Sequence, residues 1–282
     1  MEALGSAQAL LTFGAFAIVG LAEGLAPRRA PGANRGERWR ANLCLGLLGI
    51  AISRSAFPLL GLASAAAAAQ GGHGLLNDAA LPAWLAALLG FLLLDLSRYA
   101  SHVAFHRVPA LWRLHRLHHA DPDVDLTTAL RAHPLEGLVV LALHLAAIAL
   151  LGIPPLALAA YLLAGTALSV VGHGNVAIPQ VVDRALRRVL VTPDMHRVHH
   201  SARPTETNAN YSTVLSVWDR LFRTYRAAPE GGHEAMQLGL PGYGDPRLLG
   251  VARLLADPFL AEPAAARQPV IHSPPSSAPA AP

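Results

Sequence analysis

A long run without a formal charge limits what this chain can fold into. Residues 137–182 contain no Asp, Glu, Lys or Arg, and most of them are apolar. A helix that crosses a bilayer needs about 20 mostly apolar residues, so the run is long enough for two crossings. Ile153, Pro154 and Pro155 divide it, because proline favours the end of one helix and the start of the next. The run therefore predicts a helical hairpin that crosses the membrane or re-enters it.

Three further apolar segments precede this hairpin, at residues 3–22, 41–64 and 79–100. No arginine stands before the first, unlike the charged start of a signal peptide, so we expect a retained helix. Arg54 and Pro58 interrupt the second. Only 14% of the chain is charged, whereas a globular domain carries about a quarter. These features predict an all-α polytopic membrane protein with about five spans, or four spans plus a re-entrant hairpin.

The positions of the arginines predict how these spans are oriented. All 22 basic residues are arginine. Segments 27–40, 98–134 and 183–282 hold five, five and eleven of them, and the intervening loops hold none. Because positive residues gather on the cytoplasmic side, we expect an external N-terminus and a cytoplasmic C-terminus, in a bacterial inner membrane. The arginines are scattered among apolar runs, so no nucleic-acid partner is expected.

Composition also suggests a division of the chain. We expect membrane spans of unassigned role in residues 1–78, a domain that contains most of the histidines in residues 79–226 and a C-terminal extension in residues 227–282. The extension is rich in Pro, Ala and Ser from about residue 261, which predicts disorder there. The single cysteine, Cys44, excludes an internal disulfide, a thiolate zinc site and an iron–sulfur cluster.

Histidine is distributed very unevenly. The chain has 14 histidines, and those between residues 102 and 200 include two copies of one pattern, HRLHH at 115–119 and HRVHH at 196–200. Residues at i, i+3 and i+4 share one face of a helix, so the three histidines of each copy are expected to converge on a common point. On the predicted spans, these motifs fall in a helical cap on the cytoplasmic side.

A third motif lies at the end of the span 79–100. His102 and His106 are spaced i, i+4, and Asp95 and Tyr99 continue the same face toward the membrane. A carboxylate at membrane depth needs a partner, which we expect to be a histidine N–H or Arg98. If these histidines bind metal, Asp95 and Tyr99 are therefore predicted to support them rather than to bind metal themselves.

The number of imidazoles indicates two metal ions rather than one. The three motifs supply eight, and His173 and His133 are further candidates. Imidazole suits Fe, Zn, Cu and Ni, so the ligand type leaves the metal open. A closed structural zinc site needs only four ligands, and a dinuclear redox site fits the larger number better. His144 departs from the motif spacing, and a hydrogen bond between helices is expected for it.

The order HVAFH, HRLHH, HRVHH resembles the histidine boxes of the fatty acid hydroxylase/sterol desaturase superfamily of integral-membrane di-iron oxygenases. Asp95 and Tyr99 before the first box, Trp112 before the second and RAHPLE at 131–136 are also similar to that family. So is NANYSTVLSVWDRLFRTY at 208–225, and the resemblance covers about residues 85–226. It implies that metal is bound by the following histidines: His102, His106, His115, His118, His119, His133, His173, His196, His199 and His200.

The resemblance also implies a chemistry. Two Fe ions, with Zn possible in purified protein, would use O2 and external electrons to hydroxylate or desaturate an unactivated C–H position of a lipid. The lipid could be sterol-like, fatty acyl, alkyl-ether or isoprenoid, and ether cleavage is a further outcome. The sequence contains no cytochrome b5-like domain, flavin fingerprint or ferredoxin cysteines, so a separate electron donor is expected, either cytochrome b5-like or a ferredoxin with its reductase. The oligomeric state is left open.

A metal-binding or metal-transporting membrane protein without enzymatic activity is the alternative. A transporter holds its ligands near the membrane midplane. Here the motifs gather at one predicted face, and only His144 lies deep in a span. This placement favours the enzyme.

Overall fold

The computed structural model describes residues 2–32, 34–79 and 81–262, and part of the predicted disordered tail lies outside them. Most of the described residues are helical and none lies in a β-strand, which confirms the predicted all-α class. In chain order, the helices are α1 (Glu2–Leu25), α2 (Arg35–Gly49), η1 (Ile50–Arg54), α3 (Ala56–Gly71), α4 (Leu75–Asp78), α5 (Ala83–Arg107), α6 (Pro109–His119), η2 (Leu126–Leu130), α7 (Pro134–Leu151), α8 (Pro155–His173), α9 (Gln180–Leu186), α10 (Pro193–His199), α11 (Pro204–Thr207), α12 (Val217–Leu221), α13 (Gly232–Ala235), η3 (Pro246–Leu249), α14 (Val251–Ala256) and η4 (Asp257–Phe259).

Five helical segments of the described chain are long and apolar enough to cross a membrane, as predicted. They are Gly5–Leu25, Arg35–Asp78, Ala83–Arg107, Pro134–Leu151 and Pro155–His173. Their outward faces are apolar: Leu10, Leu150 and Leu156 are 75%, 74% and 71% exposed. Large apolar side chains cover an outer surface when lipid rather than water surrounds it. The protein is thus a polytopic membrane protein.

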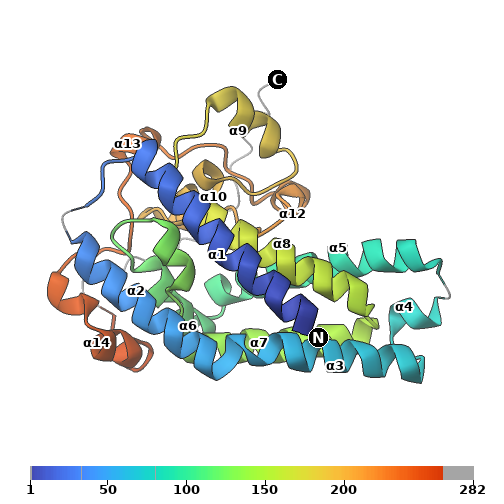
Figure 1. Ribbon diagram of the computed structural model, residues 1–282. Helices are drawn as coiled ribbons and strands as arrows, with labels where there is room; N and C mark the ends of the chain where they lie inside the picture. Colours follow the sequence, from blue (N-terminus) through green and yellow to red (C-terminus); the bar gives the residue numbers. More distant parts are fainter. Residues whose placement is uncertain (1, 33, 80, 263–282) are drawn as a thin grey trace.

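The second of these segments is longer than predicted. The sequence indicates a span at residues 41–64, whereas α2, the π-helical η1 and α3 form one nearly continuous rod that α4 follows. In the π turn, the Ser55 N–H donates to the carbonyl of Ile50, five residues earlier, at 3.3 Å. Single π turns commonly relieve a local misfit within a long helix. The rod reaches from the loops at one end to the histidine motifs at the other, and it packs along α7 (Figure 1).

Two connecting loops meet at the end of the molecule far from the histidine motifs. Gly152 ends α7 with φ 64°, and Gly74 precedes α4 with φ 98°. A Cβ atom on Gly74 would lie 2.4 Å from the Gly152 nitrogen, so both positions require glycine. Figure 1 shows α4 at this end, away from α6 and α10. Leu94, Ile148 and Leu158 form the core between the helices that lead away from it.

The N-terminal helices are joined to the loop that follows the second histidine motif. Arg38 of α2 is buried and donates to Asp125 at 3.0 Å and to Asp121. Asn42, one turn later, donates to Asp121 at 3.1 Å and accepts from Arg131 at 3.0 Å. The buried Arg38 is paired with these aspartates, which is the condition for burying charges without a large loss of stability. The network fixes residues 121–131 against α2.

Candidate metal centre

The structure brings nine of the ten predicted metal-binding histidines into two adjacent groups. The imidazole nitrogens of each group lie within 4.8 Å of one another. The first group contains His102, His106, His115, His119 and His199, and the second contains His118, His173, His196 and His200. They come from α5, α6, α8 and α10, or from the residue that follows α10. Segments distant in the sequence thus form one buried cluster.

Each HRxHH motif contributes to both groups. His115 and His119 join the first group, while His118 joins the second. In the other motif, His196 and His200 join the second group and His199 joins the first. The expectation that each triplet converges on one point is therefore wrong, because the i+3 side chain leaves the helix at a different angle from the i and i+4 pair.

The ring orientations are set by hydrogen bonds at Nδ1. His102 Nδ1 donates to the Tyr211 carbonyl at 2.6 Å, and His199 Nδ1 donates to the Ala209 carbonyl at 2.7 Å. His118 Nδ1 donates to the Arg131 carbonyl at 2.9 Å, and His115 Nδ1 donates to Glu136 at 2.8 Å. His173 Nδ1 donates to the Ser169 carbonyl at 2.7 Å. A carbonyl or carboxylate can only accept, so each of these rings carries its proton on Nδ1 and leaves a lone pair on Nε2.

These Nε2 atoms point at one another. The separation is 3.0 Å between His102 and His199, 3.1 Å between His102 and His115, and 3.1 Å between His118 and His173. Two lone pairs at such distances repel unless a cation lies between them. Metal–imidazole bonds are about 2.0–2.1 Å long, so nitrogens about 3 Å apart are spaced as neighbouring ligands of one ion. The donor set therefore fits two metal ions.

The protonation state of the cluster agrees with this fit. Burial holds the pKa of His115, His119 and His200 well below its ordinary value, and lowers the pKa of His199 to about 3. The rings are consequently neutral at physiological pH, which is the form that binds metal.

His133, the tenth candidate, lies outside both groups. Its Nδ1 accepts from the Leu135 N–H at 3.1 Å and begins α7 as an N-cap. Its Nε2 donates to the Leu255 carbonyl at 3.1 Å. His144 lies within α7, where its Nδ1 bonds to Val140 of the same helix rather than to another helix.

Asp95 and Tyr99 share one face of α5, as their spacing predicts. In the structure this face contacts the segment 211–224. Asp95 accepts from the Trp218 indole at 2.8 Å and from the Leu215 N–H at 3.1 Å, rather than from a histidine or Arg98. Tyr99 bonds to Thr224 at 2.9 Å. Asp95 therefore makes no hydrogen bond to a histidine or to Arg98, although Arg98 interacts with its carboxylate electrostatically. Both side chains hold the segment whose Tyr211 carbonyl orients His102.

Glu136 has a role in the site that sequence reasoning did not assign. The sequence places Glu136 only within the RAHPLE segment at 131–136, whereas in the structure its carboxylate accepts from His115 Nδ1. Its signal was present, since it is the last carboxylate before the charge-free run. The carbonyls of Ser169, Ala209 and Tyr211 could not be found, because a backbone acceptor leaves no mark on the residue type.

The two motif arginines point away from the cluster and anchor other segments. Arg116 is 1% exposed and donates to Asp257 at 2.7 Å and to the Leu260 carbonyl at 3.0 Å. Arg197, also buried, donates to Asp194 and to the Gly174 carbonyl at 3.1 Å. Arg116 thus holds the C-terminal extension on α6. Arg197 holds Gly174, the residue after His173, on α10.

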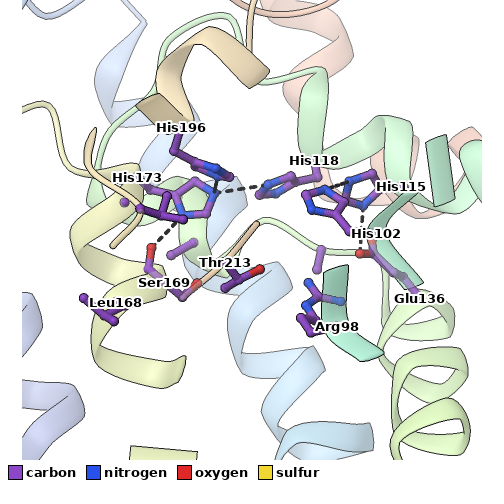
Figure 2. A pocket seen from close by; sticks show the side chains of 14 residues that line it. Arg98, His102, His115, His118, Glu136, Leu168, Ser169, His173, His196 and Thr213 are labelled. Carbon is purple, nitrogen blue, oxygen red and sulfur yellow. Dashed lines mark hydrogen bonds and ion pairs between the residues drawn. The ribbon is translucent and has the colours of Figure 1, made fainter. Parts of the chain in front are cut away.

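A cavity of about 100 Å³ adjoins the cluster (Figure 2). His118, His173 and His196 of the second group line it, together with His102 and His115 of the first. Its other walls come from α5, α7 and α8, which include Arg98 and Leu168, and from loops that include Thr213. The histidines thus face a space between membrane helices.

Comparison with known proteins shows which family and which relatives this chain resembles. Residues 87–224 match the family model described as fatty acid hydroxylase. An ornithine lipid hydroxylase of Rhizobium tropici is 32% identical over 145 residues, which are 50% of this chain and 42% of that protein. Human alkylglycerol monooxygenase is 32% identical over 149 residues, 52% of this chain and 31% of that protein. A rice very-long-chain aldehyde decarbonylase is 34% identical over 161 residues, 52% of this chain and 25% of that protein. The chain thus spans less than half the length of these relatives, and no solved structure matches.

Proposed function

Residues 87–224 belong to the fatty acid hydroxylase/sterol desaturase superfamily, and from this premise we propose that the chain is a membrane-bound di-iron oxygenase acting on a lipid. One observation carries the proposal: two groups of buried, neutral imidazoles face each other beside a cavity between membrane helices. Hydroxylation converts R–H, O2, two electrons and two protons into R–OH and water. Desaturation of a CH2–CH2 pair consumes the same reagents and yields an alkene and two waters.

The nine clustered histidines would hold the metal, and iron is the occupant proposed. Two iron ions bound there would supply the activation of O2 that oxidation of an unactivated C–H bond requires. Zinc can occupy the same donors in purified protein, because imidazole accepts both metals. His133 is not part of the proposed ligand set, since both of its ring nitrogens are engaged elsewhere.

The protein's own residues fix the ligands and exclude water. Glu136 and four backbone carbonyls hold the Nδ1 protons, which fixes each tautomer and aims each Nε2 at the metal position. Asp95 and Tyr99 are proposed as positioning residues for the Tyr211 carbonyl. The ligand side chains are buried or nearly so, which keeps bulk water from a reactive site.

The location of the cluster supports a route for lipid and electrons. α5 and α8 carry His102 and His173 near the ends of membrane spans, so a bilayer lipid can approach sideways. We propose a bacterial inner membrane with the histidines and the C-terminus on the cytoplasmic side, where a separate cytochrome b5-like or ferredoxin-type donor can dock. In the same way, residues 79–226 are proposed as the catalytic domain, with flanking segments at 1–78 and 227–282.

The decisive experiment combines metal analysis with lipid analysis. The full chain would be expressed in a lipid-producing host beside His199→Ala, His200→Ala and a control, His73→Ala, in which the changed side chain is exposed. Wild type and the control should hold about two metal ions per chain and generate a lipid that is oxidised or desaturated. Each site variant should lose metal and the lipid product.

Two outcomes would contradict the proposal. Iron-loaded protein supplied with electrons that consumes no O2 and alters no lipid would exclude the oxygenase. Metal-dependent accumulation of ions inside cells or vesicles, without a lipid product, would instead favour a transporter.

A further inference from the structure

Arg98 is a charged side chain that the proposed oxidation does not use. It lies on α5 one turn before His102, and it lines the cavity beside the cluster (Figure 2). His102, His115 and His118 share that cavity with it. A guanidinium therefore faces the space in which a substrate would meet the metal site.

Arg98 keeps a hydrogen-bond donor for which the described part of the chain provides no acceptor. Its Nη1 atom is buried and has no hydrogen-bond partner. Asp95, three residues earlier, interacts electrostatically with Arg98, but its Oδ2 accepts from Trp218 and Leu215 and no hydrogen bond joins the two described side chains. The buried Arg38, Arg116 and Arg197 each form an ion pair with an aspartate, whereas Arg98 forms none in the described chain. Arg131 and Arg197 also keep one nitrogen without a partner, but neither lines this cavity. A charged side chain with a free donor in a membrane span is typical of a functional site.

A structural role explains this arrangement poorly. An arginine near the end of a span can extend along the outer surface to the interface, whereas Arg98 faces an internal cavity. Support of the metal is also excluded as a purpose, because a cation beside two metal ions weakens their binding. The free Nη1 donor of Arg98 needs an acceptor that no described residue provides.

The cavity limits what that group can belong to. Pockets that enclose a drug-sized ligand measure about 300–1,000 Å³, and this cavity measures about 100 Å³. It can therefore admit one end of a lipid and not a whole acyl chain. Leu168 on its wall suits methylene groups, while Thr213 and Arg98 suit a polar end.

We propose that Arg98 binds an oxyanion of the lipid substrate, a carboxylate or a phosphate, within a few bonds of the carbon that is oxidised. A planar guanidinium matches both groups with two parallel hydrogen bonds. Because Arg98 and His102 are one helical turn apart, the oxidised carbon lies near the charged end of the lipid rather than in the middle of its chain. This inference rests on the proposed function, in that it takes the cavity as the substrate site.

The test measures binding of defined lipids to the purified, metal-loaded full chain. Oleate, 1-oleoyl-lysophosphatidate and uncharged mono-olein would be titrated into wild type, Arg98→Gln, Arg98→Lys and Arg113→Gln. Arg113 is an exposed arginine on α6 and serves as the control. Wild type and Arg113→Gln should bind one anionic probe at least about tenfold more tightly than mono-olein, as expected for a charged hydrogen-bonded pair. The probe that shows this preference distinguishes carboxylate from phosphate.

Arg98→Gln should lose the preference and keep its affinity for mono-olein, while Arg98→Lys should retain part of it. Metal content is measured on every variant. The inference is wrong if Arg98→Gln and Arg98→Lys bind anionic probes as wild type does, or if both lose metal, which would make Arg98 a structural residue. Failure of the inference alone leaves wild-type lipid oxidation intact. Failure of the proposed function appears instead as wild type that binds two metals and oxidises no lipid.

Discussion

The partner of His115 shows how one side chain next to the metal site can be tested. Glu136 accepts from His115 Nδ1 at 2.8 Å, so Glu136→Gln replaces a charged acceptor with a neutral one. Loss of such a partner lowers metal affinity by about 10–100-fold. Competition with a chromogenic chelator measures this affinity, and Glu37→Gln, an exposed change on α2, is the control. An affinity equal to that of wild type would show that Glu136 does not tune the site.

A second prediction concerns the titration of the buried histidines. Burial lowers the pKa of His199 from 6.5 to about 3, and lowers the pKa of His119 and His200 in the same direction. Below pH 6.5 the unfolded chain therefore binds protons that the folded chain does not, so the folded state loses stability as the pH falls. The Tm of metal-free protein should decrease between about pH 8 and pH 5. His199→Gln should reduce this pH dependence, and a Tm that is flat over the range would contradict the assignment.

At the residue scale, the sequence predicted the members of the cluster better than their arrangement. Spacing along one helix indicated that His115, His118 and His119 would act together. It could not show that His118 joins His196 and His200, because this depends on how α6 and α10 lie relative to each other. Spacing could not identify the carbonyls that orient the histidines. It also could not identify the hydrogen-bond partners of Asp95, because they lie 120 and 123 residues away.

At the scale of helices, the C-terminal extension is attached to the site through α6. Arg116 and Asp257 form a buried pair, and Tyr243 and Arg253 also bond to Asp257. Removing one partner of a buried ion pair costs about 3–5 kcal/mol. Arg116→Ala should therefore lower the free energy of unfolding by that amount and expose residues 236–260 to protease. Arg113→Ala, on the same helix but exposed, should change stability by no more than about 0.5 kcal/mol. Equal protease resistance in the two variants would show that the extension is held in another way.

The spans were predictable because apolar length can be read directly along the chain. The hairpin at 137–182 became α7 and α8, with the division at the expected residues. The length of the rod from α2 to α4 was not predictable. Arg38 and Asn42 of α2 look like ordinary interfacial residues until the aspartates of residues 121–125 are seen against them.

At the scale of the whole molecule, the arginine distribution predicts which end faces the cytoplasm. Cys44→Ser removes the only cysteine, and His73→Cys or Arg188→Cys then places a single thiol at either end of the molecule. A membrane-impermeant maleimide should label residue 73 in intact cells, and residue 188 only after the cells are opened, because external loops lack arginine. The reverse labelling pattern would show that the histidines face outward.

The exchange of i+3 histidines between the two groups has a consequence for how the ions enter. Each of α6 and α10 has histidines in both groups, so on the proposed function the first ion to bind would order the helices that the second one needs. Loading should then be cooperative: the chain with a single ion is scarce, and the titration curve is sigmoidal. Native mass spectra recorded at substoichiometric iron should contain mainly empty and doubly loaded chains. A dominant singly loaded species would mean that the two positions fill independently.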